Sequence, residues 1–302
     1  MIKFFERLFN RNRRKPETSE HEGGFVQTAP LTDEQLQPVT VAPLVIEPAH
    51  LLVGVGQSVG KQRERNEDAL FSLSSILSDG NTELPFGVFI VADGMGGHEH
   101  GEVASGVAVR AMAEYVLSRS YLPFLSMEDR QRSSLQEVME NGVVQAQQAV
   151  VRYAPGGGTT LTAALVVGEQ VTLAHVGDSR AYFVHPDGRM QVITQDHSLV
   201  HRLVELGQIS EQEALVHPQR NVLYRALGQS EPFRPDILTH PMPRPGFLLM
   251  CSDGLWGVLS EKEMFQIITS ARNPAIACKN LVDAANAAGG PDNISVILVQ
   301  YL

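Results

Sequence analysis

Five aspartates stand where an apolar run of the sequence gives way to glycine or to a turn. They occur in the segments ERNEDAL, FIVADGMGG, LAHVGDSRAY, LLMCSDGLW and GGPDNIS, as Asp68, Asp93, Asp178, Asp253 and Asp292. An aspartate after a strand is a common turn former, so one such site alone would indicate only a turn. Five in one chain, with the similar pair VADG and CSDG among them, favour a shared chemical role.

Carboxylates gathered at one end of a sheet repel one another unless something compensates their charge. Hard divalent cations do so, and ligation by oxygen atoms alone suits Mg²⁺ or Mn²⁺. A glycine after the aspartate, as at Gly94, lets the backbone carbonyl approach the same ion. Two such ions about 4 Å apart can share a water and direct it at phosphorus in line with the leaving group. The pattern therefore predicts a two-metal site that acts on a phosphate ester.

Other residues with chemical potential are fewer. Arg63, five residues before Asp68, is the candidate for binding phosphate, because a guanidinium binds phosphate in a bidentate manner; Arg65 is the alternative. Cys251 and Trp256 are interpreted as packing residues. Asp196-His197-Ser198 contains the residue types of a catalytic triad, but neighbours in sequence do not form one, so these residues do not predict a triad.

The elements that would carry these residues are short runs rich in Val, Ile, Leu and aromatic side chains. The predicted strands span 51–58, 84–92, 161–167, 171–176, 180–185, 190–194, 247–251 and 294–301. Helical spacing of apolar residues predicts one pair of helices over 102–120 and 127–153 and a second pair over 261–271 and 274–288. Because strands and helices occur in groups and do not alternate, we expect an α+β fold with two sheets face to face and helices outside.

The ends of the chain differ from its body. Residues 1–15 hold six of the 24 Lys and Arg residues but only one of the 34 acidic residues, so the remainder is strongly acidic. An acidic body argues against nucleic acid as the main partner. Residues 16–50 contain five prolines and no Lys or Arg, which is typical of a disordered linker. We therefore expect the folded domain to span 51–302.

Residues 1–15 have two open interpretations. As a helix the segment would gather Ile2, Phe5 and Phe9 on one side beside basic residues, as in a weak anchor to anionic membrane surfaces. A disordered basic tail is the alternative. The chain has no apolar run long enough to span a membrane, and its N-terminus lacks the apolar core of a secretion signal. We expect a cytoplasmic protein, with association at the membrane surface as an open question.

Taken in order, the motifs resemble those of the PP2C-type metal-dependent serine/threonine protein phosphatases, and in particular their bacterial members. The resemblance extends over 51–302 and rests on GKQRERNEDAL, VADGMGGHEHGEVAS, GTTLTAALV, AHVGDSRAY, TQDHSLV, HPQRNVLYRALG, LMCSDGLWGVL and GGPDNISVILV. Any one motif is weak evidence, whereas the ordered set is specific. It implies a β-sandwich of two antiparallel sheets flanked by helix pairs, in four αββα layers.

The resemblance also implies roles for individual residues. The ligands of two core ions, Mn²⁺ or Mg²⁺, would be Asp68, Asp93, Gly94 through its carbonyl, Asp253 and Asp292. Asp178 would hold a third, weaker ion together with Asp253. Glu67 would reach an ion mostly through water, Asn293 would support the ligands from behind, and Arg63 would bind the phosphate. Residues 203–228 correspond to a mobile flap beside the site.

One position departs from the eukaryotic members of this family. Many of them carry a histidine directly after the Asp-Gly pair, and this chain has Met95 there. The nearby His98 would then be a general acid, or else a structural or substrate-contacting residue. A metal-coordinated water is the alternative proton donor.

The implied activity is hydrolysis of phosphoserine and phosphothreonine in proteins, through attack by a water that bridges two ions. The substrates would be targets of serine/threonine kinases, or the kinase itself, and the enzyme would be a monomer acting in signalling. Two alternatives are a pseudophosphatase that only binds phosphoproteins and a switch phosphatase for a transcription regulator. All five aspartate positions are filled, which favours the active enzyme over the pseudophosphatase.

Overall fold

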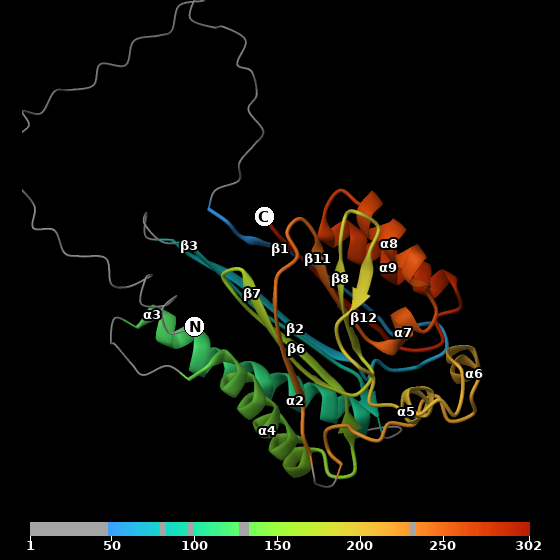
Figure 1. Cartoon of the computed structure of the whole chain (residues 1–302). Coiled ribbons are helices and arrows are strands. Elements are labelled where there is room, and N and C mark those ends of the chain that lie inside the picture. Colours follow the sequence, from blue (N-terminus) through green and yellow to red (C-terminus); the bar gives the residue numbers. More distant parts are fainter. Residues whose placement is uncertain (1–47, 79–82, 96–99, 127–132, 230–232) are drawn as a thin grey trace, which may run out of the picture.

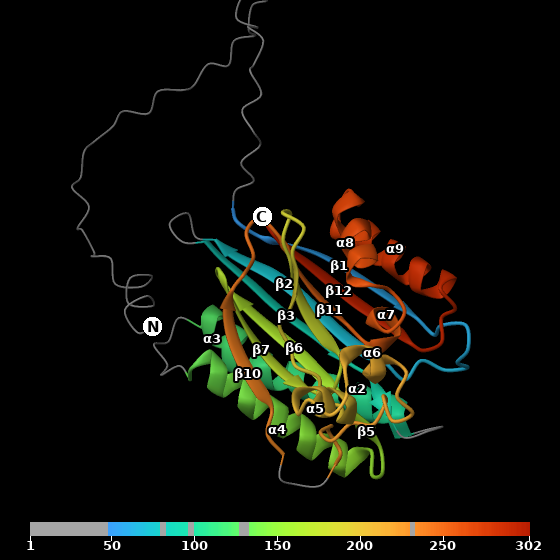
Figure 2. The same ribbon diagram turned by 45° about the vertical axis from the view of Figure 1, so that its right-hand side comes forward.

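The computed structural model describes residues 48–78, 83–95, 100–126, 133–229 and 233–302. The predicted segment 1–15 and nearly all of the predicted linker 16–50 lie outside these residues. The described residues form four layers, in which two sheets pack face to face and helices cover both outer faces (Figures 1 and 2). The predicted α+β class, with two antiparallel sheets and flanking helix pairs, is confirmed.

The first sheet joins the two ends of the described chain. Its five strands pair antiparallel in the order β1(Leu51–Ser58), β12(Ile294–Tyr301), β11(Phe247–Cys251), β8(Arg180–Val184) and β9(Met190–Val192). The pairing of β1 with β12 continues beyond the strands, because the backbone amide of Leu302 donates to the carbonyl of His50 at 2.9 Å. The last residue of the chain therefore lies beside the start of the first strand.

The second sheet also has five antiparallel strands. They run in the order β10(Asp236–Pro241), β7(Gln170–Val176), β6(Leu161–Val167), β3(Glu83–Ala92) and β2(Ala69–Ser78). The two edge strands, β10 and β2, were not predicted from the sequence. In β2 (ALFSLSSILS), serines interrupt the apolar positions. In β10 (DILTHP), the run is short and ends at a proline. Both lack the continuous apolar character of a strand that is covered on both faces.

Central strands are buried on both faces because alternate side chains serve different cores. In β3, Val88 packs toward α2 and α4, whereas Phe89 packs between the two sheets. In β11, Leu248 lies between the sheets, whereas Leu249 and Cys251 pack toward α8 and α9. Period-two alternation thus builds three apolar layers from two sheets. Cys251 is fully buried, in agreement with its interpretation as a packing residue.

One helix pair covers each outer face of the sandwich (Figure 1). α2(His100–Val116) and α4(Leu135–Tyr153) cover the second sheet, and α8(Glu261–Ser270) and α9(Pro274–Ala287) cover the first. The predicted helix 127–153 began too early, because Ser134 caps α4 in a capping box with Glu137. Residues 127–132 lie outside the described part. After α2 the chain continues through a π-helical turn, η2(Leu117–Tyr121), into α3(Leu122–Leu125).

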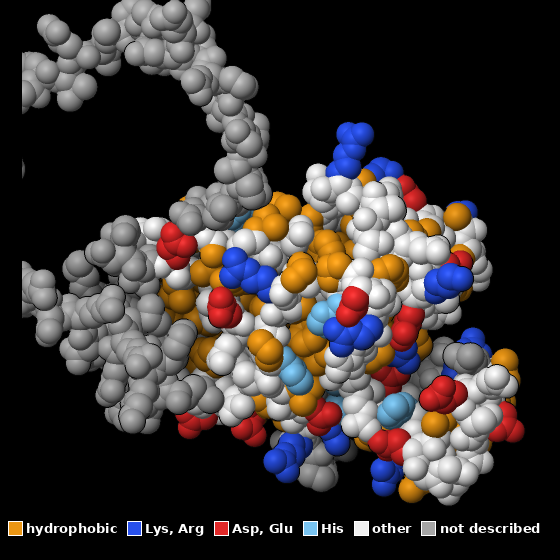
Figure 3. Space-filling view, turned by 45° about the horizontal axis from the view of Figure 1, so that its top comes forward, with side chains coloured by type: hydrophobic (Ala, Val, Ile, Leu, Met, Phe, Trp, Pro, Cys, Tyr) orange, Lys and Arg blue, Asp and Glu red, His pale blue; other side chains and the backbone are white. Residues whose placement is uncertain are grey.

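Short elements gather at one end of the sandwich. The predicted flap 203–228 holds the end of α5(Leu199–Glu205) and all of α6(Glu211–Leu215), and α6 lies near α7(Asp253–Trp256) in both ribbon views (Figures 1 and 2). The short strands β4(Gly94–Met95) and β5(Gly158–Thr159) pair at the same end. On the face seen in Figure 3, acidic and basic side chains are intermixed, and no broad basic area is visible there.

Candidate metal centre

Strand pairing brings Asp68 and Asp93 together at the end of the second sheet. Ala69 pairs with Ala92, so the two aspartates flank one rung of the β2–β3 ladder. The amide of Gly94 donates to the carbonyl of Glu67 at 3.2 Å, which continues the pairing past the strands. The antiparallel register alone therefore makes neighbours of residues 25 positions apart in the sequence.

The first sheet contributes Asp253 and Asp292 from β11 and β12. Asp253 begins α7 directly after β11, and Asp292 lies in the loop before β12. Ser252 connects the two sheets, because its hydroxyl donates to Asp68 Oδ2 at 2.7 Å while its amide donates to the carbonyl of Ser295 at 3.1 Å. This hydroxyl bond holds the ends of both sheets at a fixed separation.

Asp178 occupies the turn by which the chain crosses from β7 of the second sheet to β8 of the first. Gly177 before it has φ +109°, a conformation that side chains rarely adopt. Trp256 Nε1 donates to the carbonyl of Asp178 at 3.0 Å. The guanidinium of Arg180 lies 3.6 Å from the centroid of the Trp256 ring. Trp256 was interpreted as packing, yet it also fixes the backbone of an aspartate at the site.

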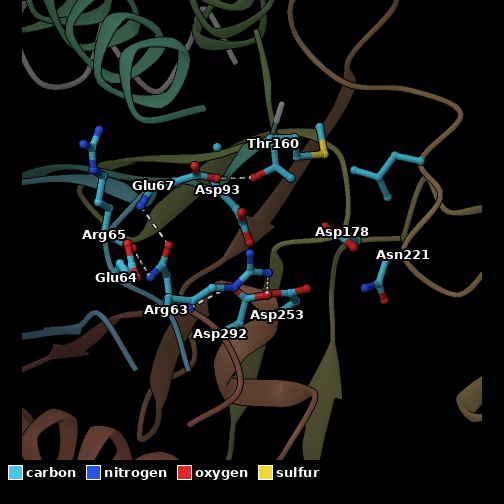
Figure 4. A pocket seen from close by; sticks show the side chains of 14 residues that line it. Arg63, Glu64, Arg65, Glu67, Asp93, Thr160, Asp178, Asn221, Asp253 and Asp292 are labelled. Carbon is cyan, nitrogen blue, oxygen red and sulfur yellow. Dashed lines mark hydrogen bonds and ion pairs between the residues drawn. The ribbon is translucent and has the colours of Figure 1, made fainter. Parts of the chain in front are cut away.

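All of these ends face one cavity of about 500 Å³ (Figure 4). Of the residues predicted for the site, the following line it: Arg63, Glu67, Asp93, Gly94, Asp178, Asp253, Asp292 and Asn293. Asp68 does not line it but lies just behind, bonded to Ser252. In Figure 4, Asp178 and Asn221 lie on the side of the cavity away from Arg63 and Asp292.

Arg63 is tied to the carboxylate cluster. Its Nη2 lies 2.6 Å from Asp292 Oδ2, and half of its side chain remains exposed. The hydrogen bond to Asp292, and the charges of Glu67 and Asp253 with it, raise the pKa of Arg63. The cluster therefore holds a permanent cation against the carboxylates that line the cavity.

In the described part of the chain, two aspartates of the cluster each keep one buried carboxylate oxygen without a partner. Asp68 Oδ1 and Asp253 Oδ1 are buried with no hydrogen-bond partner among the residues described. Burial, with repulsion between neighbours, raises the pKa of Asp68 to about 7 and that of Asp253 to about 6. The same causes raise the pKa of Asp178 to about 8 and that of Asp93 well above its usual value. The site therefore favours whatever supplies positive charge to these oxygens.

The described side chains do not by themselves form a complete set of metal ligands. Within the described ranges, no three carboxylate, imidazole or thiolate groups are already arranged to hold a metal. Asp93, Asp178, Asp253 and Asp292 line the same cavity, with Asp178 on the side away from Asp292.

Residues behind the carboxylates fix the loops that carry them. Asn293 Oδ1 accepts from the amide of Glu67 at 2.7 Å, and its Nδ2 donates to the carbonyls of Val59 and Arg65, each at 2.8 Å. A Cβ at Gly94 would lie 2.5 Å from the carbonyl oxygen of Glu67. Only glycine therefore fits where the two loops approach each other.

Four further residues that line the cavity were not predicted: Glu64, Thr160, Asn221 and Leu223. Met95 also lines it and had been noted only for replacing a histidine. Thr160 Oγ1 accepts from the amide of Asp93 at 2.9 Å. The motifs GKQRERNEDAL, GTTLTAALV and HPQRNVLYRALG contain these four residues, so the resemblance was the available signal. His98 lies outside the described residues, and its predicted role stays a prediction.

Comparison with known proteins decides what this arrangement is. The family model for protein phosphatase 2C matches residues 53–294. The chain belongs to the protein phosphatase 2C family. It is 38% identical over 242 residues to the serine/threonine phosphatase stp of Listeria innocua, a match that covers 80% of this chain and 92% of the relative.

Solved structures agree with this assignment. The serine/threonine phosphatase PstP/Ppp of Mycobacterium tuberculosis matches with a TM-score of 0.67 and 30% identity, over 83% of this chain and 98% of that one. The catalytic domain of PstP in complex with two manganese ions matches with a TM-score of 0.66 and 29% identity, over 83% and 98% of the two chains.

Membership in the protein phosphatase 2C family makes this chain a metal-dependent protein phosphatase, with phosphorylated proteins as its class of substrate. The enzyme interpretation is therefore favoured over the binding-only alternative. The roles of individual side chains stay predictions. In the part of the chain that the structure describes, no helix is long and apolar enough to cross a membrane.

Proposed function

We propose that this protein phosphatase 2C family member hydrolyses phosphoserine and phosphothreonine in proteins, with divalent ions held by Asp68, Asp93, Asp253 and Asp292. The observation that carries the proposal is the pair of buried, unpartnered carboxylate oxygens, one on Asp68 and one on Asp253. Unpaired buried carboxylates are costly, so their retention at one cavity indicates a ligand that compensates them.

The residues fit a hard divalent cation. The donors offered are carboxylate and carbonyl oxygens, which Mn²⁺ and Mg²⁺ prefer. The carbonyl of Gly94 belongs to this set, since the missing side chain leaves room for close approach of the backbone. When bound, a pair of such ions supplies Lewis-acid chemistry that activates water and offsets charge on the phosphoryl group.

The protein's own groups would bind and orient the phosphate. Arg63 stands at the mouth of the cavity, held on one side by Asp292 and half exposed on the other. Its remaining guanidinium donors suit two phosphoryl oxygens at once. Asn293 would keep the loop before Glu67 in place while the ester binds. The alternative, Arg65, also lines the cavity, and its backbone carbonyl accepts from Asn293.

We further propose a third and weaker ion between Asp178 and Asp253. These two carboxylates interact electrostatically, because the charge of Asp253 contributes to the raised pKa of Asp178. Fewer anionic oxygens surround this position than the central pair, so less of the cost of dehydrating an ion would be offset there. Either Mn²⁺ or Mg²⁺ suits such a site.

The proposed activity is tested with a phosphothreonine peptide and the full chain. Phosphate release should require added Mn²⁺, continue at some level with Mg²⁺, and stop on chelation. Arg63→Ala should raise KM for the peptide more than Arg65→Ala does, which separates the two candidate arginines. Hydrolysis that is insensitive to chelator would contradict the metal-dependent interpretation.

We propose that the enzyme is a cytoplasmic monomer. We further propose that residues 1–15 associate weakly with anionic membrane surfaces. The support is sequence alone: apolar side chains at helical spacing beside six basic residues. Deletion of residues 1–15 should abolish pelleting with phosphatidylserine vesicles and leave hydrolysis of a small phosphoester unchanged. Equal pelleting of both forms would favour the disordered tail.

A further inference from the structure

Three separate segments of the chain meet at His197, a histidine that the site described above does not use. Its side chain is almost fully buried. On one side it contacts the turn that carries Asp178, and on another the β10 residue Asp236. Its backbone carbonyl accepts from the amide of Tyr224 in the flap at 3.0 Å.

The contact with the Asp178 turn is reciprocal. The amide of His197 donates to the carbonyl of Gly177 at 2.7 Å, and the amide of Gly177 donates back to His197 Nδ1 at 3.1 Å. Gly177 is also confined from the opposite side, because a Cβ there would lie 2.6 Å from Cβ of Thr160. The residue before Asp178 is therefore held between the His197 ring and Thr160, which itself bonds the amide of Asp93.

These bonds determine the tautomer of His197. A backbone amide can only donate, so Nδ1 must carry no proton. In a neutral ring, Nε2 then carries the proton. Nε2 lies 3.1 Å from Asp236 Oδ2 and 3.0 Å from Arg225 Nη1, and because a guanidinium can only donate, the Nε2 proton is donated to Asp236. Burial lowers the pKa of His197, in agreement with a neutral ring. The ring therefore has two distinct functions: an acceptor for the Asp178 turn and a donor toward β10.

The donor side leads on to the flap. Arg225 Nη1 donates to Asp236 Oδ1 at 3.0 Å, so His197 and Arg225 share one carboxylate. The backbone next to His197 continues the contact, since the amide of Leu199 donates to the carbonyl of Val222 at 2.8 Å. Within this flap segment, Asn221 and Leu223 line the catalytic cavity.

A second buried histidine, His175 on β7, contacts the His197 segment. The His175 ring lies 5.0 Å from the His197 ring, and its Nε2 is 3.1 Å from the carbonyl of Gln195. A carbonyl can only accept, so this nitrogen also carries a proton. The segment 195–197 is thus fixed on the second sheet. The Asp178 turn and the flap are in turn held by their contacts with this segment.

We propose that His197 is a positioning residue that holds the Asp178 turn and the flap segment 221–225 in one fixed relation. Docking of a phosphoprotein on the flap and the placement of Asp178 would then depend on each other. This inference rests on the proposed function, and it assigns no chemical step to His197. Through His197, a contact at the flap would affect the position of Asp178 in the cavity.

Two conservative variants separate the two functions of the ring. In His197→Asn, the side-chain oxygen can still accept near the Nδ1 position, but the donor to Asp236 is lost. In His197→Gln, the amide nitrogen can still donate near the Nε2 position, but the acceptor for Gly177 is lost. His197→Ala removes both. His185→Ala, at a partly exposed histidine near the far end of β8, is the matched control.

Kinetics with Mn²⁺ compare para-nitrophenyl phosphate with a phosphothreonine peptide, per folded protein. We expect His197→Ala to lose about tenfold or more in turnover on both substrates, since a buried amide is left unpaired at the Asp178 turn. His197→Asn should keep turnover of the small ester and lose peptide kcat/KM through KM, whereas His197→Gln should lose turnover on both. A purely structural role would lower only the melting temperature. Activities within twofold of wild type on both substrates in His197→Ala would overturn the inference.

Amide hydrogen exchange of the full chain provides a readout independent of activity. In His197→Ala, exchange should accelerate together at 176–178 and at 221–225, and in His197→Asn at 221–225 alone. If wild type hydrolyses neither substrate with Mn²⁺, the proposed function fails, while the exchange pattern still tests the coupling. Unchanged exchange of both segments in His197→Ala would overturn the coupling itself.

Discussion

Two aspartates at neighbouring points of the fold, one buried and one partly buried, are treated in opposite ways. Asp196 accepts a two-pronged bond from Arg180, with Nε at 3.0 Å from Oδ1 and Nη2 at 2.8 Å from Oδ2. Asp253, at the start of α7 just after β11, keeps one buried oxygen without a partner in the described part of the chain. Burial and the charge of Asp292 raise the pKa of Asp253 to about 6.

The difference in hydrogen bonding distinguishes carboxylates that stabilise the fold from carboxylates that are available to bind a ligand. A buried carboxylate that is fully bonded stabilises its surroundings, whereas one left unpaired costs free energy. The carboxylate cluster at the cavity therefore lowers the stability of the metal-free protein. We expect such a cluster only where a bound cation compensates the negative charge, so substitutions of the two kinds of aspartate should have opposite effects on stability.

The largest effect is expected from Asp253→Asn. Loss of a supporting residue behind a metal ligand typically costs up to about 100-fold, so loss of a ligand shared between ions should cost more than that in kcat/KM. Stability should move the other way. With chelator at pH 8, the variant should melt at a higher temperature than wild type, because one charge of a mutually repelling group has been removed.

Activity assays across Mn²⁺ concentrations and thermal melts in chelator check both parts. Full activity at high Mn²⁺ would contradict the ligand role of Asp253. A lower melting temperature than wild type in chelator would contradict the view that the metal-free cluster is strained by its own charge.

Much of this contrast was accessible from sequence, but not all of it. The five aspartates and Arg63 could be found because each lies in a local motif at the end of an apolar run. Their convergence follows from antiparallel register, which places residues on either side of a rung together. The edge strands were missed because an edge strand need not be apolar on both faces, and α7 because four residues give no helical period.

Roles that depend on distant partners could not be predicted. Trp256 looks like a packing residue until its indole nitrogen is seen to bond the backbone of Asp178, 78 positions away. His197 acquires its meaning from Asp236, 39 positions away, on a strand that was itself not predicted. Local pattern identifies residue types with a chemical role, whereas tertiary contacts determine what holds those residues in place.

Asp178→Ala should show the next largest effect and tests whether the contrast is graded within the site. The two central ions should still bind, while turnover falls about tenfold or more because the third ion is lost. The loss should be steepest for protein substrates, since the flap lies on the Asp178 side of the cavity. Calorimetric titration with Mn²⁺ beside kinetics on the folded protein measures both. Unchanged stoichiometry with wild-type turnover would mean that Asp178 only forms the turn.

The pH dependence of the metal-free protein gives a smaller effect in wild type. An unfolded aspartate has a pKa of about 3.9, whereas burial raises the pKa of Asp68 to about 7 and that of Asp178 to about 8 in the fold. Between these limits the folded state binds more protons, so the free energy of unfolding falls as pH rises from about 4 to about 8. The melting temperature in chelator should therefore decrease over that range, and Mn²⁺ should restore it most at the upper end. A flat profile in chelator would contradict the raised pKa values.

Asp196→Asn should have the smallest effect and the opposite pattern to Asp253→Asn. Its carboxylate neutralises Arg180, whose guanidinium also covers the Trp256 ring. Asparagine can accept only part of the two-pronged bond and leaves the guanidinium charge uncompensated. The loss should be about 2 kcal/mol in the free energy of unfolding, the usual cost of breaking a hydrogen bond to a charged group. Because Asp196 does not line the cavity, Mn²⁺ stoichiometry should stay at the wild-type value and the folded fraction should turn over within about threefold of wild type. Denaturant titration and calorimetry check the two halves. Stabilisation by this substitution in chelator, as expected for Asp253→Asn, would erase the distinction between the two kinds of aspartate.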